Sequence, residues 1–382
     1  MPVLWILSSL LHGYVALRLL PWLVAWPIAA VSLGGLLALS TVLLPLGLRT
    51  LRRRRGGRDA ALHWAGMVSL GALSSLVVLT LLRDAGLLLA HAVDAVWPAA
   101  LGLDAIALGS AVAVPLLGAT ATAWGYANAR RTARPVEVDL PVAGLPPALE
   151  GFTIVQLSDV HVGATIGHAY VSAIVDAVNR LEPDLVAITG DLVDGGVPEL
   201  APHVAPLAGL RSRHGTFFVT GNHEYYSGAP AWIAALRGLG MRVLLNEHVV
   251  LRAGDASLVL AGVTDWSAGH FDPAQRSDPV AALAGAPADA GARVLLAHQP
   301  RSAPGAAAAG FDVQLSGHTH GGQFLPWTWF VRLQQPYTAG LHRLGRLVVY
   351  VSRGTGYWGP PKRFGAPSEI TRLRLIAAPR MG

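Results

Sequence analysis

The stretch Gly317-His318-Thr319-His320-Gly321-Gly322-Gln323 follows the apolar run Val313-Gln314-Leu315-Ser316 and sets two imidazoles one residue apart. Other polar stretches also come directly after short apolar runs: Asp159-Val160-His161, Gly190-Asp191-Leu192-Val193-Asp194, Gly221-Asn222-His223-Glu224 and Ala297-His298. In open α/β sheets, sites form beyond the carboxyl ends of strands, so side chains that end separate strands can converge. Together these stretches predict a metal site made of carboxylate, amide and imidazole ligands.

The composition indicates a chain that is partly in lipid. Its 382 residues suit two domains, while a mean hydropathy of +0.45 and 14% charged residues are too apolar for a wholly soluble chain. The sequence has no cysteine, which excludes disulfides, thiolate ligands and a cysteine nucleophile. Any metal must therefore be held by oxygen and imidazole nitrogen.

The basic charge is confined to the apolar half of the chain. Residues 1–134 carry a net charge of +7, whereas residues 135–382 carry −1. Arginines that flank apolar segments determine membrane topology, so the high isoelectric point does not indicate a phosphate-binding face. We therefore expect no nucleic-acid partner.

Residues 1–134 are predicted to form a transmembrane region with about four helices. The apolar segments are residues 4–20, 21–48, 61–82 and about 105–127, which approach or reach the roughly 20 residues that a spanning helix needs. A signal peptide is the alternative for the first segment, but it lacks a basic leader and a clear cleavage site, which favours a retained anchor. The third segment is expected to end at Arg83-Asp84, which leaves residues 86–97 as an interfacial or re-entrant piece.

Arginines near the helix ends predict the orientation. One group lies between Arg49 and Arg58, with Arg52, Arg53, Arg54 and Arg55 inside it, and another is formed by Arg130, Arg131 and Arg134. Positive charge favours the cytoplasmic side, so both termini and the catalytic domain are predicted on the cytoplasmic face of the cell (inner) membrane, in a multi-pass protein. Ionisable residues in or near apolar segments are functional candidates by default. Here they are His12, Asp94 and Asp104.

The rest of the chain is predicted to be an α/β domain. Residues 135–150 are rich in proline and read as a linker, residues 151–376 as the domain, and residues 377–382 as a tail. Expected strands at 152–157, 185–189 and 216–220 alternate with helices near 168–181, 199–210 and 230–239. This alternation predicts a largely parallel sheet, and the short apolar runs after residue 241 predict a second, mixed sheet packed on it.

The order and spacing of the five motifs resemble the calcineurin-like metallophosphoesterase superfamily, over roughly residues 150–376. A closer likeness is to its bacterial membrane-anchored branch. That likeness rests on Gly317 to Gln323 and on the tail Val351-Ser352-Arg353-Gly354-Thr355-Gly356-Tyr357-Trp358-Gly359-Pro360-Pro361. The resemblance implies a four-layer α/β/β/α sandwich, preceded here by the all-α transmembrane region.

The resemblance also implies two divalent metal ions. Asp159, His161 and His320 would hold the first ion, and Asn222, His298 and His318 the second. Asp191 would bridge the two. A shared carboxylate offsets the repulsion between two close cations, and neutral imidazoles complete the shell without adding charge. Oxygen and nitrogen ligands suit Mn²⁺, Fe or Zn²⁺, and the residue types do not rank these metals.

In the superfamily that this chain resembles, the histidine of the Gly-Asn-His-Glu motif faces the leaving group. His223 is therefore expected to act as the general acid, and Asp194 to orient it. The Ser/Thr phosphatase branch has an arginine after its second aspartate, whereas this chain has Gly195-Gly196. This difference weakens the case for a phosphoprotein substrate. Gln323 and Arg353 are the remaining candidates for binding a phosphate or pyrophosphate.

These observations predict a membrane-bound phosphoesterase that cleaves a phosphodiester or pyrophosphate bond. Some members of the similar branch hydrolyse UDP-2,3-diacylglucosamine, so a lipid-linked or nucleotide-linked substrate is the first expectation. A tethered phosphodiesterase with a soluble substrate and a non-catalytic membrane scaffold are the alternatives. The aromatic stretch Phe324 to Phe330 beside the site suits either core packing, which is favoured here, or the lipid interface.

Overall fold

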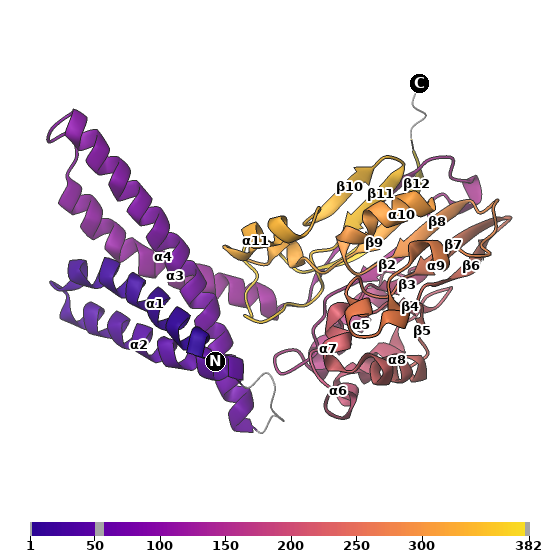
Figure 1. Ribbon diagram of the computed structural model, residues 1–382, viewed down its shortest axis with the longest axis horizontal. Coiled ribbons are helices and arrows are strands. Elements are labelled where there is room, and N and C mark those ends of the chain that lie inside the picture. The colour runs from indigo at the N-terminus through magenta and orange to yellow at the C-terminus, as the bar shows by residue number, and fades with distance from the viewer. Residues whose placement is uncertain (1, 50–56, 379–382) are drawn as a thin grey trace. The chain divides into compact units, whose positions relative to one another are not determined.

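Long apolar helices make up most of the chain before Arg130 (Figure 1). The computed structural model describes residues 2–49 and 57–378. Arginines 52–55, which contribute to the predicted orientation, lie outside the described part. Residues 379–382 of the predicted tail also lie outside it. The chain divides into a helical unit, which contains the residues up to Arg130 with Phe324–Pro326 and Gly359–Phe364, and a sheet unit that contains the remainder.

Four helices of the helical unit are long and apolar enough to cross a membrane. They are α1 (Pro2–Leu19, extended by the short helix η1, Leu20–Leu23), α2 (Pro27–Arg49), α3 (Gly57–Val96) and α4 (Leu103–Arg130). Large aliphatic side chains cover their outer surfaces, with Ile28 as an example at 85% exposure. Such a surface is stable in hydrocarbon and not in water.

Helix α3 corrects the prediction that the third segment ends at Arg83-Asp84, because it continues without a break to Val96. The charged pair is tolerated inside the helix because its groups are bonded to neighbouring helices. Arg83 Nε donates to Ser110 Oγ at 3.1 Å, and the Asp84 carboxylate accepts from Arg18 Nε at 2.9 Å. Residues 86–96, expected to be interfacial or re-entrant, are therefore part of one helix.

Of the polar candidates in this region, His12 is fully bonded. Its Nδ1 lies 2.8 Å from Ser8 O, and its Nε2 lies 2.8 Å from Ser40 Oγ on α2. Asp104 lies in the first turn of α4, where a carboxylate interacts favourably with the helix dipole. Asp94 lies near the end of α3. These contacts give His12 and Asp104 structural roles, and their functional roles stay predictions.

Two short segments from later in the chain pack inside the helical unit. Lys362, the only lysine of the sequence, is 2% exposed there. Its Nζ donates to Gly71 O at 2.6 Å and to Ser75 Oγ at 2.5 Å, both on α3. The ring of Phe324, from the other segment, lies 5.4 Å from the same Nζ.

The sheet unit contains two six-stranded sheets, with the strand orders β1-β12-β2-β3-β4-β5 and β10-β11-β9-β8-β7-β6. The strands are β1 (Arg134–Val142), β2 (Thr153–Leu157), β3 (Leu185–Ile188), β4 (Thr216–Phe218), β5 (Arg242–Val243), β6 (Glu247–Ala253), β7 (Ala256–Gly262), β8 (Ala292–Leu296), β9 (Val313–Ser316), β10 (Gly340–Leu344), β11 (Leu347–Val351) and β12 (Glu369–Ala377). Its helices are α5 (His168–Asn179), α6 (Val197–Val204), α7 (Asn222–Ser227), α8 (Ala229–Gly238), α9 (Pro279–Ala282), α10 (Ala303–Ala309) and α11 (Trp327–Gln334).

In the first sheet, β2, β3, β4 and β5 are parallel, as the strand and helix alternation predicts. The prediction of a linker at residues 135–150 is wrong for residues 135–142, because β1 pairs in parallel with β12 over nine residues, from Arg134 to Val142. Proline is compatible with this strand because β1 is at the edge of the sheet, where a missing N–H need not face a partner. The edge position explains why Pro135 and Pro141 fit.

The second sheet is mixed, as expected, with parallel β7, β8, β9 and β11 and antiparallel edge strands β6 and β10. Buried residues from both sheets form one core cluster, for example Ile154 and Leu185 of the first sheet with Val294 and Leu315 of the second. Helices α9 and α10 lie on the second sheet, and α5, α6 and α8 lie with the first (Figure 1). The predicted four-layer α/β/β/α sandwich is confirmed.

Candidate metal centre

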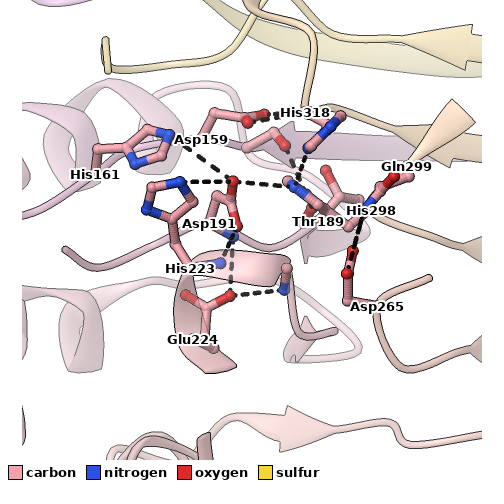
Figure 2. Close-up of polar contacts among 12 residues, drawn as sticks. Asp159, His161, Thr189, Asp191, His223, Glu224, Asp265, His298, Gln299 and His318 are labelled. Atoms are coloured by element: carbon pink, nitrogen blue, oxygen red, sulfur yellow. Dashed lines mark hydrogen bonds and ion pairs between the residues drawn. The ribbon is translucent and has the colours of Figure 1, made fainter. Parts of the chain in front are cut away.

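The polar motifs follow the ends of five strands, β2, β3, β4, β8 and β9, which belong to both sheets. Because the strands end at the same edge of the sandwich, the side chains that follow them lie close together (Figure 2). Local sequence therefore determines which residues enter the site, and the sheet topology brings them within reach of one another.

Asp159, His161 and His320 form the first potential ligand group. Each offers an atom that lies within 4.8 Å of the others, and all three residues are buried. Their nitrogens face each other, since His161 Nε2 lies 3.0 Å from His320 Nε2, and His320 Nε2 lies 3.6 Å from Asp159 Oδ1. A carboxylate and two imidazoles at this separation suit one borderline divalent cation.

Asp191, His298 and His318 form the second group. His298 Nε2 lies 3.1 Å from Asp191 Oδ2 and 3.1 Å from His318 Nδ1. The other nitrogen, His298 Nδ1, donates to Thr189 O at 2.7 Å, which fixes the ring so that Nε2 faces the group. Burial, with the charge of His298, lowers the pKa of His318 to about 3, so this imidazole is neutral.

Asp191 and Asn222 provide the observation that tests whether metals fit. Asp191 Oδ2 lies 4.0 Å from His161 Nε2 of the first group, as well as close to His298 of the second, so it stands between the groups. Asn222 Oδ1 is buried and has no hydrogen-bond partner among the described residues. A buried amide oxygen without a partner is costly unless a ligand occupies it. The donor set therefore fits a pair of divalent cations.

The backbone at these positions adopts an uncommon conformation. Several residues of the two groups have left-handed backbone angles: Asp159, His161, Asp191, His318 and His320, with φ of +52°, +55°, +50°, +71° and +51°. Such conformations cost free energy in non-glycine residues and concentrate at functional sites. Gly317 is required in the same region because a Cβ there would collide with Ser158 Oγ and Asp159 Oδ2.

Glu224 supports the metal groups from beneath. This fully buried carboxylate accepts from the backbone N–H groups of Asp191 at 3.0 Å, Leu192 at 2.8 Å and Gly221 at 2.6 Å. Burial and the neighbouring Asp191 raise the pKa of Glu224 to about 8. The structure shows that this one side chain joins two of the motifs.

His223 lies beside both groups and is bonded to Asp194. The Nδ1 atom lies 2.7 Å from Asp194 Oδ1, and the same oxygen lies 2.8 Å from His161 Nδ1. Burial lowers the pKa of His223, but the charge of Asp191 and the hydrogen bond to Asp194 outweigh it and raise the pKa to about 9. The Nε2 atom, 4.0 Å from Asp191 Oδ2, is turned toward the metal groups.

Aromatic side chains that the sequence analysis missed surround His223. The ring of Tyr226 lies 5.3 Å from its imidazole and that of Trp358 lies 5.8 Å away, and both are at least half exposed. Phe271, also half exposed, lies 5.7 Å from Tyr226. The signal for Tyr226 was its place two residues after Glu224, whereas Phe271 follows no motif.

The two predicted phosphate-binding side chains make other contacts. The Gln323 amide bonds both ways to the backbone of Trp358, with Nε2 2.9 Å from its carbonyl oxygen and Oε1 3.0 Å from its nitrogen. Arg353 Nη1 lies 3.2 Å from Glu369 Oε2 and keeps 38% of its side chain exposed. Gln323 therefore positions Trp358, and substrate binding by either residue stays a prediction.

Asp265 holds a turn beside the site. Its carboxylate accepts from Ser267 N at 2.8 Å. It also accepts from Gln299 Nε2 at 3.1 Å (Figure 2). Since Gln299 directly follows His298, this contact fixes the loop that carries a potential ligand.

Comparison with known proteins agrees with this geometry. The profile of the calcineurin-like phosphoesterase family matches residues 152–322. A relative from Danio rerio, called transmembrane protein with metallophosphoesterase domain, is 36% identical over 84% of this chain and 76% of its own length. The relative of the same name from Bos taurus is 43% identical over 67% of this chain and 60% of its own length.

A bacterial relative, an uncharacterized metallophosphoesterase from Helicobacter pylori, is 42% identical over 58% of this chain and 59% of its own length. The chain thus spans about three fifths of two of these relatives. The chain belongs to the calcineurin-like metallophosphoesterase family, as the motifs indicate. It is a phosphoester hydrolase with a metal-binding domain and transmembrane helices.

Proposed function

We propose that this protein hydrolyses a phosphodiester or pyrophosphate bond in an amphiphilic substrate, such as a nucleotide-linked lipid. The observation that carries the proposal is the placement of His223. This imidazole is joined to a carboxylate on one side and faces both ligand groups on the other. A proton donor beside a dinuclear centre is the arrangement that expels an alkoxide or phosphate leaving group.

In this proposal Asp159, His161 and His320 hold one divalent cation, Asn222, His298 and His318 hold the other, and Asp191 bridges them. When bound, the two cations activate water and neutralise charge on the phosphoryl oxygens. Mn²⁺, Fe and Zn²⁺ all suit this donor set. The backbone contacts of Glu224 keep the bridging carboxylate in place while substrate enters and leaves.

The protein's own contribution to the reaction is the proton. Because the pKa of His223 is raised to about 9, its imidazole is protonated at neutral pH in the protein without metal. Asp194 accepts from Nδ1 at 2.7 Å, which fixes the ring and directs Nε2 toward the leaving group. His223 donates that proton as the bond from phosphorus to the leaving oxygen breaks.

The surroundings of His223 favour a large leaving group. Tyr226, Phe271 and Trp358 present exposed aromatic faces beside the proton donor, and such faces bind planar or apolar groups. The chain also has Gly195 and Gly196 after Asp194, where a phosphate-clamping arginine would favour a phosphoprotein. Membrane anchoring raises the local concentration of a substrate that itself lies in the membrane.

We also propose in which membrane the protein lies and on which face of that membrane the sheet unit lies. The arginines that follow α2 and the end of α4, Arg130 with Arg131 and Arg134, favour the cytoplasmic face of the inner membrane for the sheet unit. Alkaline phosphatase fused after residue 134 is expected to be inactive in the cytoplasm. An active fusion would show that the topology is the reverse of the one proposed.

The test compares three substrates with the purified full chain in Mn²⁺: bis-p-nitrophenyl phosphate, p-nitrophenyl phosphate, and a detergent-dispersed nucleotide-linked lipid. We expect the diester and the lipid to be hydrolysed and the monoester to be poor. The variant His223→Ala is expected to be inactive, with His168→Ala, an exposed histidine outside the site, as its control. Hydrolysis of the soluble diester without hydrolysis of the lipid would favour a tethered phosphodiesterase. Activity of His223→Ala equal to that of wild type would refute the proposed donor.

A further inference from the structure

Helix α11 (Trp327–Gln334) has no buried residue, although five of its eight residues are large and apolar. Trp329, Phe330 and Leu333 are 54%, 50% and 83% exposed. The prediction that this aromatic stretch packs in the core is therefore wrong for α11, and holds for Phe324, which is 2% exposed. An exposed aromatic helix beside an active site needs a partner.

The three exposed side chains share one face of the helix. At about 100° per residue, Trp329, Phe330 and Leu333 fall within an arc of roughly 100°. Thr328 lies on the opposite side, where its Oγ1 lies 3.4 Å from Gly322 O. The helix thus rests on the sheet unit through its polar side and directs its apolar strip, Trp329, Phe330 and Leu333, away from that unit.

Helix α11 is fixed to the loops that carry potential ligands. Gly322, which contacts Thr328, comes two residues after His320. At the other end, the Gln335 amide donates to Gln299 Oε1 at 3.2 Å, and Gln299 directly follows His298. The apolar strip is therefore held in a constant position relative to the metal centre.

The chain just before α11 belongs to the helical unit. Phe324 packs there against Lys362, whose Nζ lies 3.5 Å from Thr122 Oγ1 on α4. From its first residue, Leu103, to Thr122, helix α4 is about 29 Å long, which equals the thickness of a hydrocarbon layer of about 30 Å. A membrane span that begins at Leu103 would thus end near Thr122, beside Lys362 and Phe324, and α11 begins three residues after Phe324 in the chain.

Aromatic residues support this level. Trp124 is 65% exposed and lies on α4 just after Thr122, and nearby Tyr126 has its ring 6.0 Å from that of Trp64. Tryptophan and tyrosine are enriched at the headgroup level of membranes. The apolar strip of α11 also contains a tryptophan, Trp329.

We propose that α11 lies in the headgroup region of the lipid bilayer, with Trp329, Phe330 and Leu333 inserted at the boundary with the hydrocarbon. An amphipathic helix with aromatic and aliphatic residues on one face binds in this plane. The contact with lipid is independent of the hydrolysis proposed above. A role of this contact in bringing a lipid substrate to the protein rests on that proposed function.

The direct test uses spin labels in the full chain. Since the sequence has no cysteine, Phe330→Cys and Leu333→Cys can each be labelled with a nitroxide at a single place. The protein is reconstituted in vesicles of phosphatidylethanolamine and phosphatidylglycerol. We expect both labels to collide several-fold more often with oxygen than with a water-soluble nickel chelate. Asp255→Cys, on an exposed turn, is the control and should show the reverse.

Two results would overturn the proposal. Labels at Phe330 and Leu333 that are as open to the nickel chelate as the label at position 255 would place α11 in water. Labels that are immobile and shielded from both reagents would indicate a protein partner instead of lipid.

A kinetic test separates lipid contact from catalysis. The variant with Trp329→Ser, Phe330→Ser and Leu333→Ser keeps the metal-binding residues and is expected to hydrolyse soluble bis-p-nitrophenyl phosphate at the wild-type rate. Against a vesicle-bound substrate, its rate should fall by about tenfold or more as local concentration is lost. Val280→Ser, which removes another exposed apolar side chain, is the control. A triple variant that matches wild type on both substrates would refute the role of α11 in substrate access. A wild type that hydrolyses neither substrate would refute only the proposed hydrolysis.

Discussion

Polar side chains are buried in both units of the chain, but for different purposes. In the helical unit, some buried polar side chains bond to a neighbouring helix, as His12 does to Ser40 and Arg83 does to Ser110. Others bond to a carbonyl of their own helix, as Thr80 does to Leu76. In the sheet unit, Asp159, Asp191 and several imidazoles are gathered within coordinating distance on a strained backbone. The first arrangement contributes to packing, whereas the second concentrates ligands at a cost in stability.

This difference has a testable form. In the helical unit, substitutions should matter through the volume they remove. In the sheet unit, substitutions that preserve volume should still abolish activity.

The largest effect is expected from Asp191→Asn, which keeps the shape and removes the charge shared between the ligand groups. Loss of metal should lower hydrolysis by more than about a hundredfold. Substitution of residues that only support the metal ligands already lowers activity by up to about that factor. In wild type, Mn²⁺ at a hundred times its Kd should stabilise the fold by about 2.7 kcal/mol. Calorimetry with and without Mn²⁺ should show no such gain for the variant, and Asp255→Asn should behave as wild type.

The second effect is that of His223→Ala on turnover. Removal of a general acid should lower kcat by about a hundred- to ten-thousandfold. Because His223 is not among the proposed ligands, the shift of Tm with Mn²⁺ should be retained. Loss of that shift would mean that His223 binds metal, and the assignment of the proton donor would fail.

The third effect concerns the helical unit. Lys362→Ala removes a side chain whose stem packs closely against Gly125. A Cβ added at Gly125 would come within 2.7 Å of Lys362 Cγ. The resulting cavity should cost about 2 kcal/mol of unfolding free energy, measured by denaturation in detergent micelles. Lys362→Met retains the stem and should recover most of this loss. A methionine variant as unstable as the alanine variant would show that charge, and not volume, determines stability here.

The smallest effect is expected at an exposed ion pair of the sheet unit. Arg374 Nε of β12 lies 2.8 Å from Asp139 Oδ1 of the edge strand β1, and water screens both charges. Arg374→Ala should leave Tm and activity unchanged within error. A clear fall in Tm would show that β1 depends on this pair, and that polar groups outside the metal centre also stabilise the sheet unit.

Much of the fold could be predicted because single segments carried the signal. The alternation of strands and helices from β2 to α8 and the four apolar helices follow from local periodicity. The bonds between elements could not be predicted. Pro135 and Pro141 suggest a linker until β12 supplies a partner strand, and Arg83-Asp84 suggests a helix end until Ser110 and Arg18 bond to it.

The site follows the same rule. Motifs such as Gly-His-x-His name their own residues, so the proposed ligands could be chosen from the sequence, and the structure brings their side chains together. Contacts between motifs were invisible. Neither the bonds of Glu224 to three backbone N–H groups nor the hold of Gln323 on Trp358 leaves a trace in the order of residues.

Lys362 gives the protein a built-in chemical reporter. As the only lysine, it is the only side chain that amine-selective reagents such as succinimidyl esters can acylate, and in the folded chain its ammonium is sealed against Gly71 and Ser75. The rate of acylation at this position, measured by mass spectrometry, therefore reports how often the helices separate enough to expose Lys362. No engineered label is needed to follow this opening of the helical unit.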